Sequence, residues 1–391
     1  MQRLIENYKR LLKLTESKFH RYIYDKINWN GRLVGIVGAR GVGKTTMILQ
    51  HIKEDMDVNR CLYVNGEDFY FASHKLVDLA DEFCKMGGEY LCIDEVHRYE
   101  GWSQELKLIY DYHPKLKVVF SGSSILDINK GVKADLSRRA IKYTMYGLSF
   151  REYLELFEGI VSKVYSLEEV LKHKVEMDAG FRPLMYFRRY IETGYYPFAL
   201  EDNYEEKLMA IVTKTLETDI PEYANMNVST GRKLKRLMAV IAESVPFKPS
   251  MATLAEVLGI SRNNVADYLL FIEEAGLITQ LRDQTGGVRS LGKVDKVYLE
   301  NTNLIYVLAK TDHAEIGNVR ETFFMNQLRV VNDPITSSTS DFCVGNYTFE
   351  IGGRNKKQKQ IRNVENAYVV KDDIEYGALN VIPLWMFGML Y

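Results

Sequence analysis

One run of residues has the types and spacing needed to hold phosphate. Residues 38–45 read GARGVGKT and fit the pattern G-x-x-x-x-G-K-[ST] at Gly38, Gly43, Lys44 and Thr45. Glycines there let backbone N–H groups turn inward around phosphate oxygens, and a helix after them would present its N-terminus to negative charge. Lys44 would reach the β- and γ-phosphates, and Thr45 would ligate Mg²⁺. We therefore predict an ATP-binding loop that consists of Gly38, Ala39, Arg40, Gly41, Val42, Gly43, Lys44, Thr45 and Thr46.

Two adjacent carboxylates follow a second apolar run, in YLCIDE at residues 90–95. If this run is a buried strand, Asp94 and Glu95 emerge at the carboxyl edge of the sheet, where open α/β sheets bind ligands. Asp94 would hold Mg²⁺ through water, and Glu95 would polarise the attacking water as a general base. The pair predicts hydrolysis of ATP, and a solvated acidic loop is the alternative.

Hydroxyl and guanidinium groups near two later apolar runs extend the set of catalytic candidates. Residues 117–124, KVVFSGSS, end in hydroxyls at the same edge, so Ser121 or Ser123 could sense the γ-phosphate or orient water, with a capped turn as the alternative. Arg138 and Arg139 precede a run at 141–145, and an arginine against the γ-phosphate would stabilise transition-state charge. A surface basic pair is the alternative for the arginines. The catalytic candidates are Lys44, Glu95, Ser121, Ser123 and Arg139.

These residues require a scaffold of alternating strands and helices. Short apolar runs lie at 33–37, 61–64, 90–93, 117–120 and 141–145, with longer amphipathic stretches between them. This alternation predicts a mainly parallel sheet with helices on both faces. We expect an α/β phosphate-loop domain over residues 1–150.

Three further regions are expected: a helical linker or lid at 151–230, a winged-helix-like region at 231–300 and a small α/β domain at 301–391. The middle region has a helix-turn-helix outline, with a turn at Gly259, an N-cap at Ser261 and a wing around Gly286-Gly287. If it binds duplex DNA, the exposed residues of the second helix would be Arg262, Asn263, Asn264 and Tyr268. The phosphate contacts would be Arg232, Lys233, Lys235, Arg236, Arg289, Lys293 and Lys296. A packing or protein-binding module is the alternative.

The last region contains carboxylates at Glu321, Asp341 and Glu350, which with a lysine could form a metal-dependent nuclease site. Position 352, where that lysine is expected, is Gly, and Lys356 or Arg354 could only substitute from a loop. We therefore expect a scaffold or nucleic-acid-binding domain in preference to a nuclease. The run at 353–362 carries Arg354, Lys356, Lys357, Lys359 and Arg362 without an acid and could contact phosphate or be solvated.

Several of these segments together resemble a known family. The segments are GARGVGKTT, YLCIDEVHRYEGWSQELKLIYD, KVVFSGSS, LSRRAIKYTMYGLSFREYL and GYYPFAL. They resemble the AAA-type ATPases of bacteria and archaea that carry a C-terminal domain of unknown function, and the resemblance covers nearly the whole chain. It implies an ATPase of the additional-strand, catalytic-glutamate class, with Lys44, Thr45, Asp94 and Glu95 in the roles given above. The family has Gly-Arg before its last core strand, so Arg139 matches the arginine while Arg138 replaces the glycine. The tail resembles a degenerate restriction-endonuclease-like fold.

Composition excludes several other classes of protein. The 391 residues contain 51 Lys+Arg and 52 Asp+Glu, so the net charge is −1 and any basic surface must be local. The four cysteines form no CxxC pair, which argues against a zinc site or a disulfide framework and fits a reducing compartment. The longest uncharged stretch, 377–391, is shorter than the roughly 20 residues that span a bilayer. We expect a cytoplasmic ATP-driven switch with no membrane partner, with a non-hydrolysing scaffold and a nuclease as alternatives.

Overall fold

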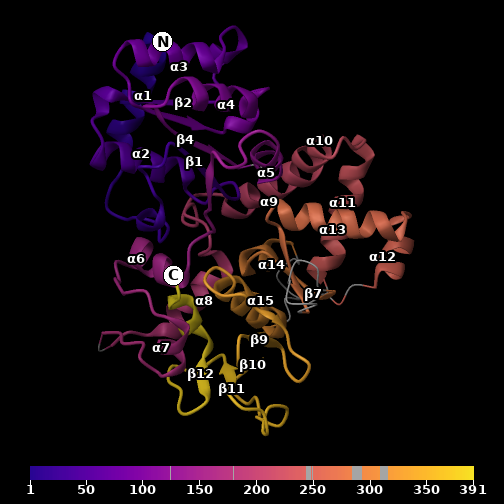
Figure 1. Cartoon of the computed structure of the whole chain (residues 1–391). Coiled ribbons are helices and arrows are strands. Elements are labelled where there is room, and N and C mark those ends of the chain that lie inside the picture. Colours follow the sequence, from indigo (N-terminus) through magenta and orange to yellow (C-terminus); the bar gives the residue numbers. More distant parts are fainter. Residues whose placement is uncertain (124, 179, 244–247, 249, 284–292, 309–315) are drawn as a thin grey trace. The chain divides into compact units, whose positions relative to one another are not determined.

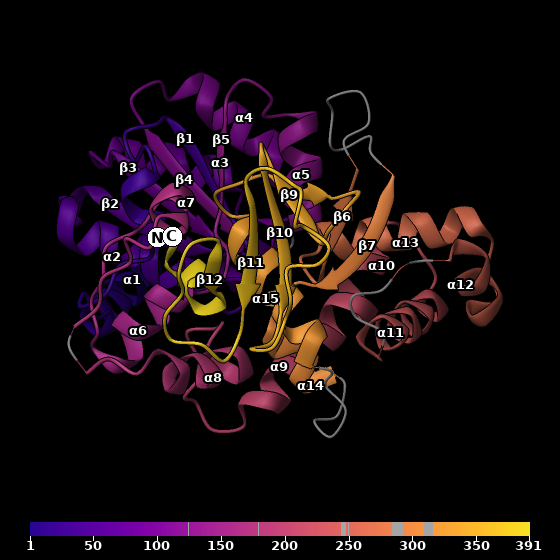
Figure 2. The ribbon, with the colours of Figure 1, turned by 90° about the horizontal axis from the view of Figure 1, so that it is seen from below.

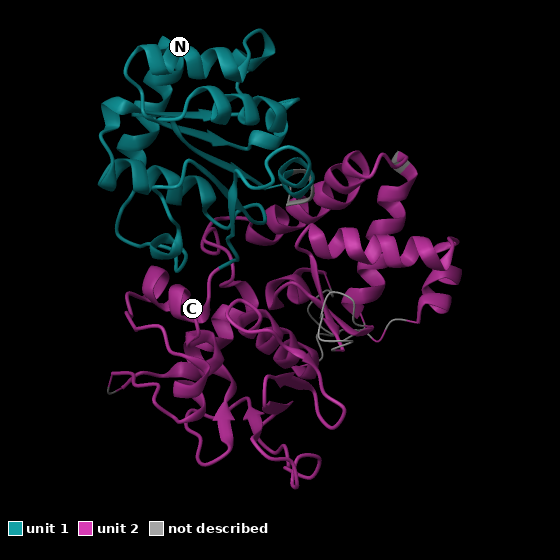
Figure 3. Cartoon of the chain, in the orientation of Figure 1, with its two compact units in different colours: residues 1–147 teal, residues 148–391 magenta. Residues whose placement is uncertain are grey.

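The computed structural model describes residues 1–391 except 124, 179, 244–247, 249, 284–292 and 309–315 (Figure 1). The chain folds into two compact units, Met1–Gly147 and Leu148–Tyr391 (Figure 3). The first unit ends within three residues of the expected boundary at 150. The finer division at 230 and 300 stays a prediction.

The first unit is built on a fully parallel five-stranded sheet with the order β2-β3-β4-β1-β5. Its strands are β1 (Leu33–Val37), β2 (Cys61–Asn65), β3 (Tyr90–Asp94), β4 (Lys117–Gly122) and β5 (Ile141–Thr144). Its helices are α1 (Gln2–Leu14), α2 (Lys44–Asp55), α3 (Leu76–Lys85), α4 (Trp102–Tyr112) and α5 (Ile125–Ala134). The expected parallel α/β sheet is confirmed, and β4 lies between β1 and β3.

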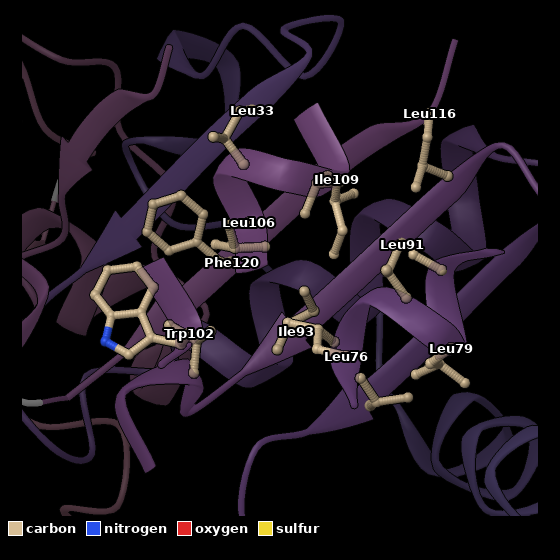
Figure 4. Close-up of a cluster of buried hydrophobic side chains, with 14 of the residues drawn as sticks. Leu33, Leu76, Leu79, Leu91, Ile93, Trp102, Leu106, Ile109, Leu116 and Phe120 are labelled. Atoms are coloured by element: carbon tan, nitrogen blue, oxygen red, sulfur yellow. The ribbon is translucent and has the colours of Figure 1, made fainter. Parts of the chain in front are cut away.

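The strands are continuous apolar runs because helices cover both faces of the sheet. Every residue of β1 and β3 is buried. Side chains of α3 and α4, among them Leu79 and Leu106, pack against Leu91 and Phe120 of the strands (Figure 4). Gly35 of β1 lies under the Phe120 ring, where a Cβ atom would come within 2.6 Å of a ring carbon. This rigid sheet fixes the strand ends from which the candidate residues emerge.

The second unit begins with helices and ends in a second sheet. The helices are α6 (Phe150–Glu158), α7 (Leu167–Leu171), α8 (Pro183–Thr193), α9 (Tyr204–Lys214), α10 (Ile220–Tyr223), α11 (Val228–Glu243), α12 (Met251–Leu258), α13 (Arg262–Glu274), α14 (Thr302–Leu308) and α15 (Ile316–Leu328). An antiparallel pair, β6 (Ile278–Arg282) and β7 (Val294–Leu299), follows α13. The expected turn at Gly286-Gly287 lies outside the described residues.

The second sheet has the order β12-β11-β10-β9-β8. Its strands are β8 (Ile335–Thr336), β9 (Phe342–Val344), β10 (Tyr347–Gly352), β11 (Ala367–Lys371) and β12 (Val381–Pro383). Figure 2 shows β10 and β11 side by side, and they pair in parallel. Phe324 of α15 packs against Phe342 and Phe349, so α15 covers one face of this sheet.

Candidate nucleotide site

The loop between β1 and α2 has the backbone that phosphate binding requires. Gly41 and Gly43 have φ angles of 80° and 98°, in the left-handed region that favours glycine. A Cβ atom on Gly38 would lie 2.2 Å from the carbonyl oxygen of Met145, so no larger residue fits there. Because α2 begins at Lys44, the loop lies at the positive end of a helix.

The Lys44 ammonium lies inside this loop. Lys44 is 5% exposed, and its Nζ donates hydrogen bonds to the carbonyl oxygens of Gly38 and Ala39, at 2.7 and 3.0 Å. Burial lowers the pKa of Lys44 to about 8, although the carboxylates of Glu95 and Asp94 act in the opposite direction. A desolvated ammonium held by loop carbonyls is suited to bind phosphate oxygens, which are stronger acceptors.

Asp94 is surrounded by hydroxyl groups. It is 2% exposed; Oδ2 accepts hydrogen bonds from Thr45 Oγ1 and, at 2.7 Å, from the Tyr63 hydroxyl, while Oδ1 accepts from Ser121 Oγ. The structure thus brings together Thr45 and Asp94, the two residues expected to hold Mg²⁺. Tyr63 was not singled out from the sequence, because it reaches Asp94 only through the pairing of β2 with β3.

Glu95 has an unusual backbone and a supported side chain. Its φ of 48° is left-handed, a conformation that costs energy for a residue with a Cβ and that clusters at functional sites. Its Oε2 accepts a 2.7 Å hydrogen bond from Ser123 Oγ and lies 3.5 Å from Nε2 of the buried His97. The two serines proposed as sensors therefore contact the two carboxylates, Ser121 through Asp94 and Ser123 through Glu95.

These residues fit an Mg²⁺-nucleotide. The described residues contain no group of three or more His, Cys, Asp or Glu side chains that could hold a metal alone. Mg²⁺ in nucleotide sites binds through one or two protein ligands together with phosphate oxygens and waters. The hydroxyl of Thr45 beside the carboxylate of Asp94 is such a pair of ligands.

Arg139 lies at the other edge of the sheet. It precedes β5, whose Ile141 pairs with Val34 near the start of β1, whereas the phosphate loop follows the end of β1. Its Nε and Nη2 each lie 3.1 Å from a carboxylate oxygen of Asp111. The structure therefore does not bring Arg139 to the phosphate loop of its own chain, and the expected finger role has no geometric support within one chain.

The residues proposed to contact DNA base edges are mostly exposed. Arg262, Asn263 and Asn264 lie in the first turn of α13, where Ser261 Oγ caps the helix by accepting from the Asn264 N–H at 3.2 Å. Tyr268 is only 6% exposed, so the expectation that it faces outward is wrong, because it belongs to the buried stripe of the helix.

The residues proposed to contact DNA phosphate differ in exposure and in their ion pairs. Arg232, Lys235 and Arg236 are exposed on α11, and Lys233 is half-buried. Lys235 is paired with Glu217 at 3.0 Å. Arg289 lies outside the described residues, and Lys293 is exposed.

Lys296 is not a free cation on a wing. Its Nζ lies 3.0 Å from Glu321 Oε2 and 3.3 Å from Asp341 Oδ1, with 12% of the side chain exposed. The expectation that it contacts DNA phosphate is therefore corrected, since both of its acidic partners already compensate its charge.

The carboxylates of the tail are engaged by lysine and hydroxyl groups of the same unit. Glu350 is 2% exposed and is bound by Ser340 Oγ at 2.7 Å and Lys356 Nζ at 2.5 Å. A Cβ atom on Gly352 would lie 2.6 Å from the Lys356 side chain, so Lys356 fills the space beside the glycine. Glu321 and Asp341 instead share Lys296, and no metal-holding group of three is found among the described residues.

No described helix is both long and apolar enough to cross a membrane.

Comparison with known proteins identifies two regions. Residues 30–154 match a family described as an AAA domain, and residues 185–315 match a domain of unknown function, DUF8612. The predicted resemblance to AAA-type ATPases with a C-terminal domain of unknown function is confirmed. The second match covers residues from α8 to the segment after α14.

Two uncharacterized proteins of Methanocaldococcus jannaschii are similar in sequence. Each is 25% identical to this chain, over 288 and 264 residues, which are 68% and 63% of this chain. The matches cover 60% and 56% of those proteins, so the chain spans somewhat more than half the length of the curated relatives.

Solved structures with similar features include the Walker-type ATPase of Pyrococcus abyssi, at 12% identity and a TM-score of 0.45. The match covers 75% of this chain and 98% of that one. AMPPCP-bound DnaA from Aquifex aeolicus matches at 18% identity and a TM-score of 0.30, over 69% of this chain and 86% of that one.

Proposed function

We propose that this chain, which carries an AAA domain at residues 30–154, is an Mg²⁺-dependent ATP hydrolase that acts as a nucleotide switch. The observation that carries the proposal is that Thr45, Asp94 and Glu95 meet beside the phosphate loop at the carboxyl edge of the first sheet. Loop, metal ligands and base are the parts that phosphoanhydride hydrolysis requires.

Each residue has one role in this proposal. The loop N–H groups and Lys44 bind the phosphates, and Thr45 and Asp94 hold Mg²⁺, which neutralises phosphate charge when bound. Glu95 takes the proton of the attacking water through its carboxylate. Because Ser123 donates to Oε2, the second oxygen of Glu95 is left to face the water.

A non-hydrolysing scaffold that binds ATP is the second candidate, and Glu95 distinguishes the two. A protein that only binds nucleotide needs no carboxylate after Asp94, and still less one held in a left-handed backbone conformation.

The test of this proposal separates binding from turnover. Lys44→Ala should abolish nucleotide binding, because Lys44 contacts ground-state phosphates. Glu95→Gln should retain affinity and lower turnover by about 10²–10⁴-fold, the usual contribution of a general base. Nucleotide affinity by calorimetry and steady-state phosphate release would be measured for both variants.

Lys85→Ala and Glu82→Gln provide matched controls, because both residues are exposed on α3 of the same unit. Wild-type affinity and turnover in both Lys44→Ala and Glu95→Gln would remove the site assignment. Wild-type protein that binds ATP without hydrolysing it would favour the scaffold.

We further propose that the second unit transmits the nucleotide state to duplex DNA. The exposed Arg262, Asn263 and Asn264 at a capped helix start support this assignment, as do Arg232 and Arg236 on α11. A protein partner is the alternative, and a nuclease is the less favoured candidate because position 352, where its lysine is expected, is Gly.

A further inference from the structure

We propose that the Arg40 side chain is a catalytic residue, which binds the γ-phosphate from within the same chain and stabilises the charge that develops during transfer. The inference rests on the proposed ATPase function and deepens it. It adds a side-chain role to a position for which the phosphate-loop motif specifies no residue type.

Arg40 has buried nitrogen atoms that nothing satisfies. Its Nε and Nη2 are inaccessible to solvent, and neither has a hydrogen-bond partner among the described residues. A buried donor without an acceptor costs about 1–3 kcal/mol, and more when the group is charged. Native proteins keep such groups chiefly where a ligand or function compensates them.

The two unsatisfied atoms form one edge of the guanidinium. The Nε–H and one N–H of Nη2 point the same way, so this edge can donate two parallel hydrogen bonds to two oxygens of one phosphate. The geometry of the donors therefore matches a phosphoryl group better than a single carbonyl oxygen.

Arg40 belongs to the phosphate loop itself, four residues before Lys44 in the segment between β1 and α2, so its backbone lies at the nucleotide site. Burial is the main cause that lowers the pKa of Lys44 to about 8 and of His97 to about 3, and the positive charge of Arg40 acts in the same direction on both. Two cations, Lys44 and Arg40, thus share a desolvated region. Their mutual repulsion would be relieved by a polyanion such as a triphosphate.

The carboxylates at this edge are already engaged. Asp94 accepts three hydroxyl hydrogen bonds and Glu95 accepts one from Ser123. No ion pair joins Arg40 to either carboxylate within the described part of the chain. An external anion is therefore the partner that fits the Arg40 charge.

The other arginines near this unit's strand ends have protein partners. Arg21 donates to the carbonyl oxygens of Val42, Tyr146 and Gly147, and Arg98 lies 3.3 Å from Glu67. Arg139 pairs with Asp111 at the opposite edge of the sheet. Among these described arginines, Arg40 has two unsatisfied donors on one edge of its guanidinium and no carboxylate partner, whereas Arg98 has Glu67 beside its Nε.

The experiment compares transition-state and ground-state affinity. Arg40→Ala should lower kcat by about 10³-fold or more, the low end for an arginine that stabilises phosphoryl transfer. Its affinity for Mg²⁺-ADP should change by only a few-fold. Its affinity for Mg²⁺-ADP with aluminium fluoride, which mimics the transferring phosphoryl group, should fall in parallel with kcat.

Arg40→Lys tests the geometry, because it keeps the charge and loses the two-donor edge; it should recover less than a tenth of the lost turnover. Arg60→Ala is the matched control, since Arg60 is half-exposed in the same unit and pairs with Glu89. It should leave all three measurements unchanged. Thermal unfolding with ADP would show that every variant folds.

Four results would overturn the proposal, and the first three would leave the proposed function standing. In the first, Arg40→Ala keeps wild-type kcat while Glu95→Gln is inactive, which leaves the ATPase assignment standing. In the second, Arg40→Ala loses ADP and ADP-aluminium fluoride affinity equally, which would make Arg40 a ground-state ligand. In the third, Arg139→Ala loses turnover while Arg40→Ala does not. A wild-type protein without turnover would overturn this proposal and the proposed function together.

Discussion

Asp94 illustrates how neighbouring side chains orient a single residue of the site. Its two oxygens accept hydrogen bonds from Thr45, Tyr63 and Ser121, so the carboxylate is held in one orientation by three hydroxyl groups. The position of Thr45 and Asp94 could be predicted because the phosphate-loop spacing and the end of an apolar strand are local signals. Tyr63 could not be predicted, because its role depends on strand register.

His97 provides a prediction about acid stability. Burial lowers its pKa to about 3, compared with about 6.5 in an unfolded chain. Between these values the unfolded state binds a proton that the folded state does not, so the free energy of unfolding decreases as pH falls below 6.5. From pH 6.5 to 5 the expected loss is about 2 kcal/mol.

The measurement is denaturant unfolding of the first unit at several pH values. In a Trp385→Phe background the remaining tryptophans, Trp29 and Trp102, both report on this unit. His97→Gln stays neutral at every pH, so it should flatten the dependence of the free energy of unfolding on pH. His74→Gln should not, because His74 is exposed. An unchanged slope in His97→Gln would contradict the prediction.

At the scale of elements, the strands of the first sheet were predicted to within two residues. This accuracy reflects burial on both faces, which turns each strand into a continuous apolar run. A wing around Gly286-Gly287 was also expected, and the antiparallel strands β6 and β7 flank that segment. The environment of Lys296 on β7 was not expected, because its partners Glu321 and Asp341 are 25 and 45 residues away in the sequence.

Lys296 therefore provides a prediction about the stability of the second unit. Burial alone would lower the pKa of Lys296, but the charges of Glu321 and Asp341 raise it, so the cation is stabilised by both carboxylates. Lys296→Met leaves two neighbouring carboxylates without a cation and should destabilise the fold by about 3–5 kcal/mol. Guanidinium unfolding followed by circular dichroism would measure this change.

Two further variants sharpen this test. Lys296→Met combined with Glu321→Gln should recover part of the loss, because one of the unpaired charges is removed. Lys293→Met removes an exposed lysine from the same ribbon and should change stability by less than about 0.5 kcal/mol. Equal effects of Lys293→Met and Lys296→Met would show that the ion pairs carry little energy.

At the scale of the whole molecule, positive and negative charges nearly cancel, so positive charge can be concentrated only in local patches. The net charge of −1 gives no general attraction to polyanions, so any nucleic-acid affinity must come from patches such as the start of α13 with α11. The chain forms two compact units, Met1–Gly147 and Leu148–Tyr391, and the domain boundaries expected from the sequence stay predictions. The long-range pairings of the second unit could not be read from local pattern, because they join segments far apart in the chain.

DNA binding is the prediction that belongs to this scale. If the second unit binds duplex DNA, Arg232→Ala and Arg236→Ala should weaken binding to all DNA sequences alike, because these exposed cations would contact phosphate. Each variant should also lower the slope of log binding constant against log salt concentration by about one unit. Arg262→Ala, Asn263→Ala and Asn264→Ala should cost roughly 1–3 kcal/mol on a preferred site and little elsewhere, because the capped start of α13 would contact base edges. Fluorescence anisotropy over a salt series would measure both effects.

The nucleotide dependence of that binding distinguishes a switch from a scaffold. A switch should bind DNA with one affinity in the presence of Mg²⁺-ATP and with another in the presence of Mg²⁺-ADP. Because Glu95→Gln binds ATP without hydrolysing it, its DNA affinity in Mg²⁺-ATP should stay at the ATP-state value over time. Lys207→Gln serves as an internal control for the salt series, because Lys207 is an exposed lysine on α9 of the same unit that already pairs with Glu201 at 2.6 Å. Absence of micromolar binding at low salt in either nucleotide would assign α11–α13 to a protein partner, because the exposed cations would then have no polyanion to neutralise.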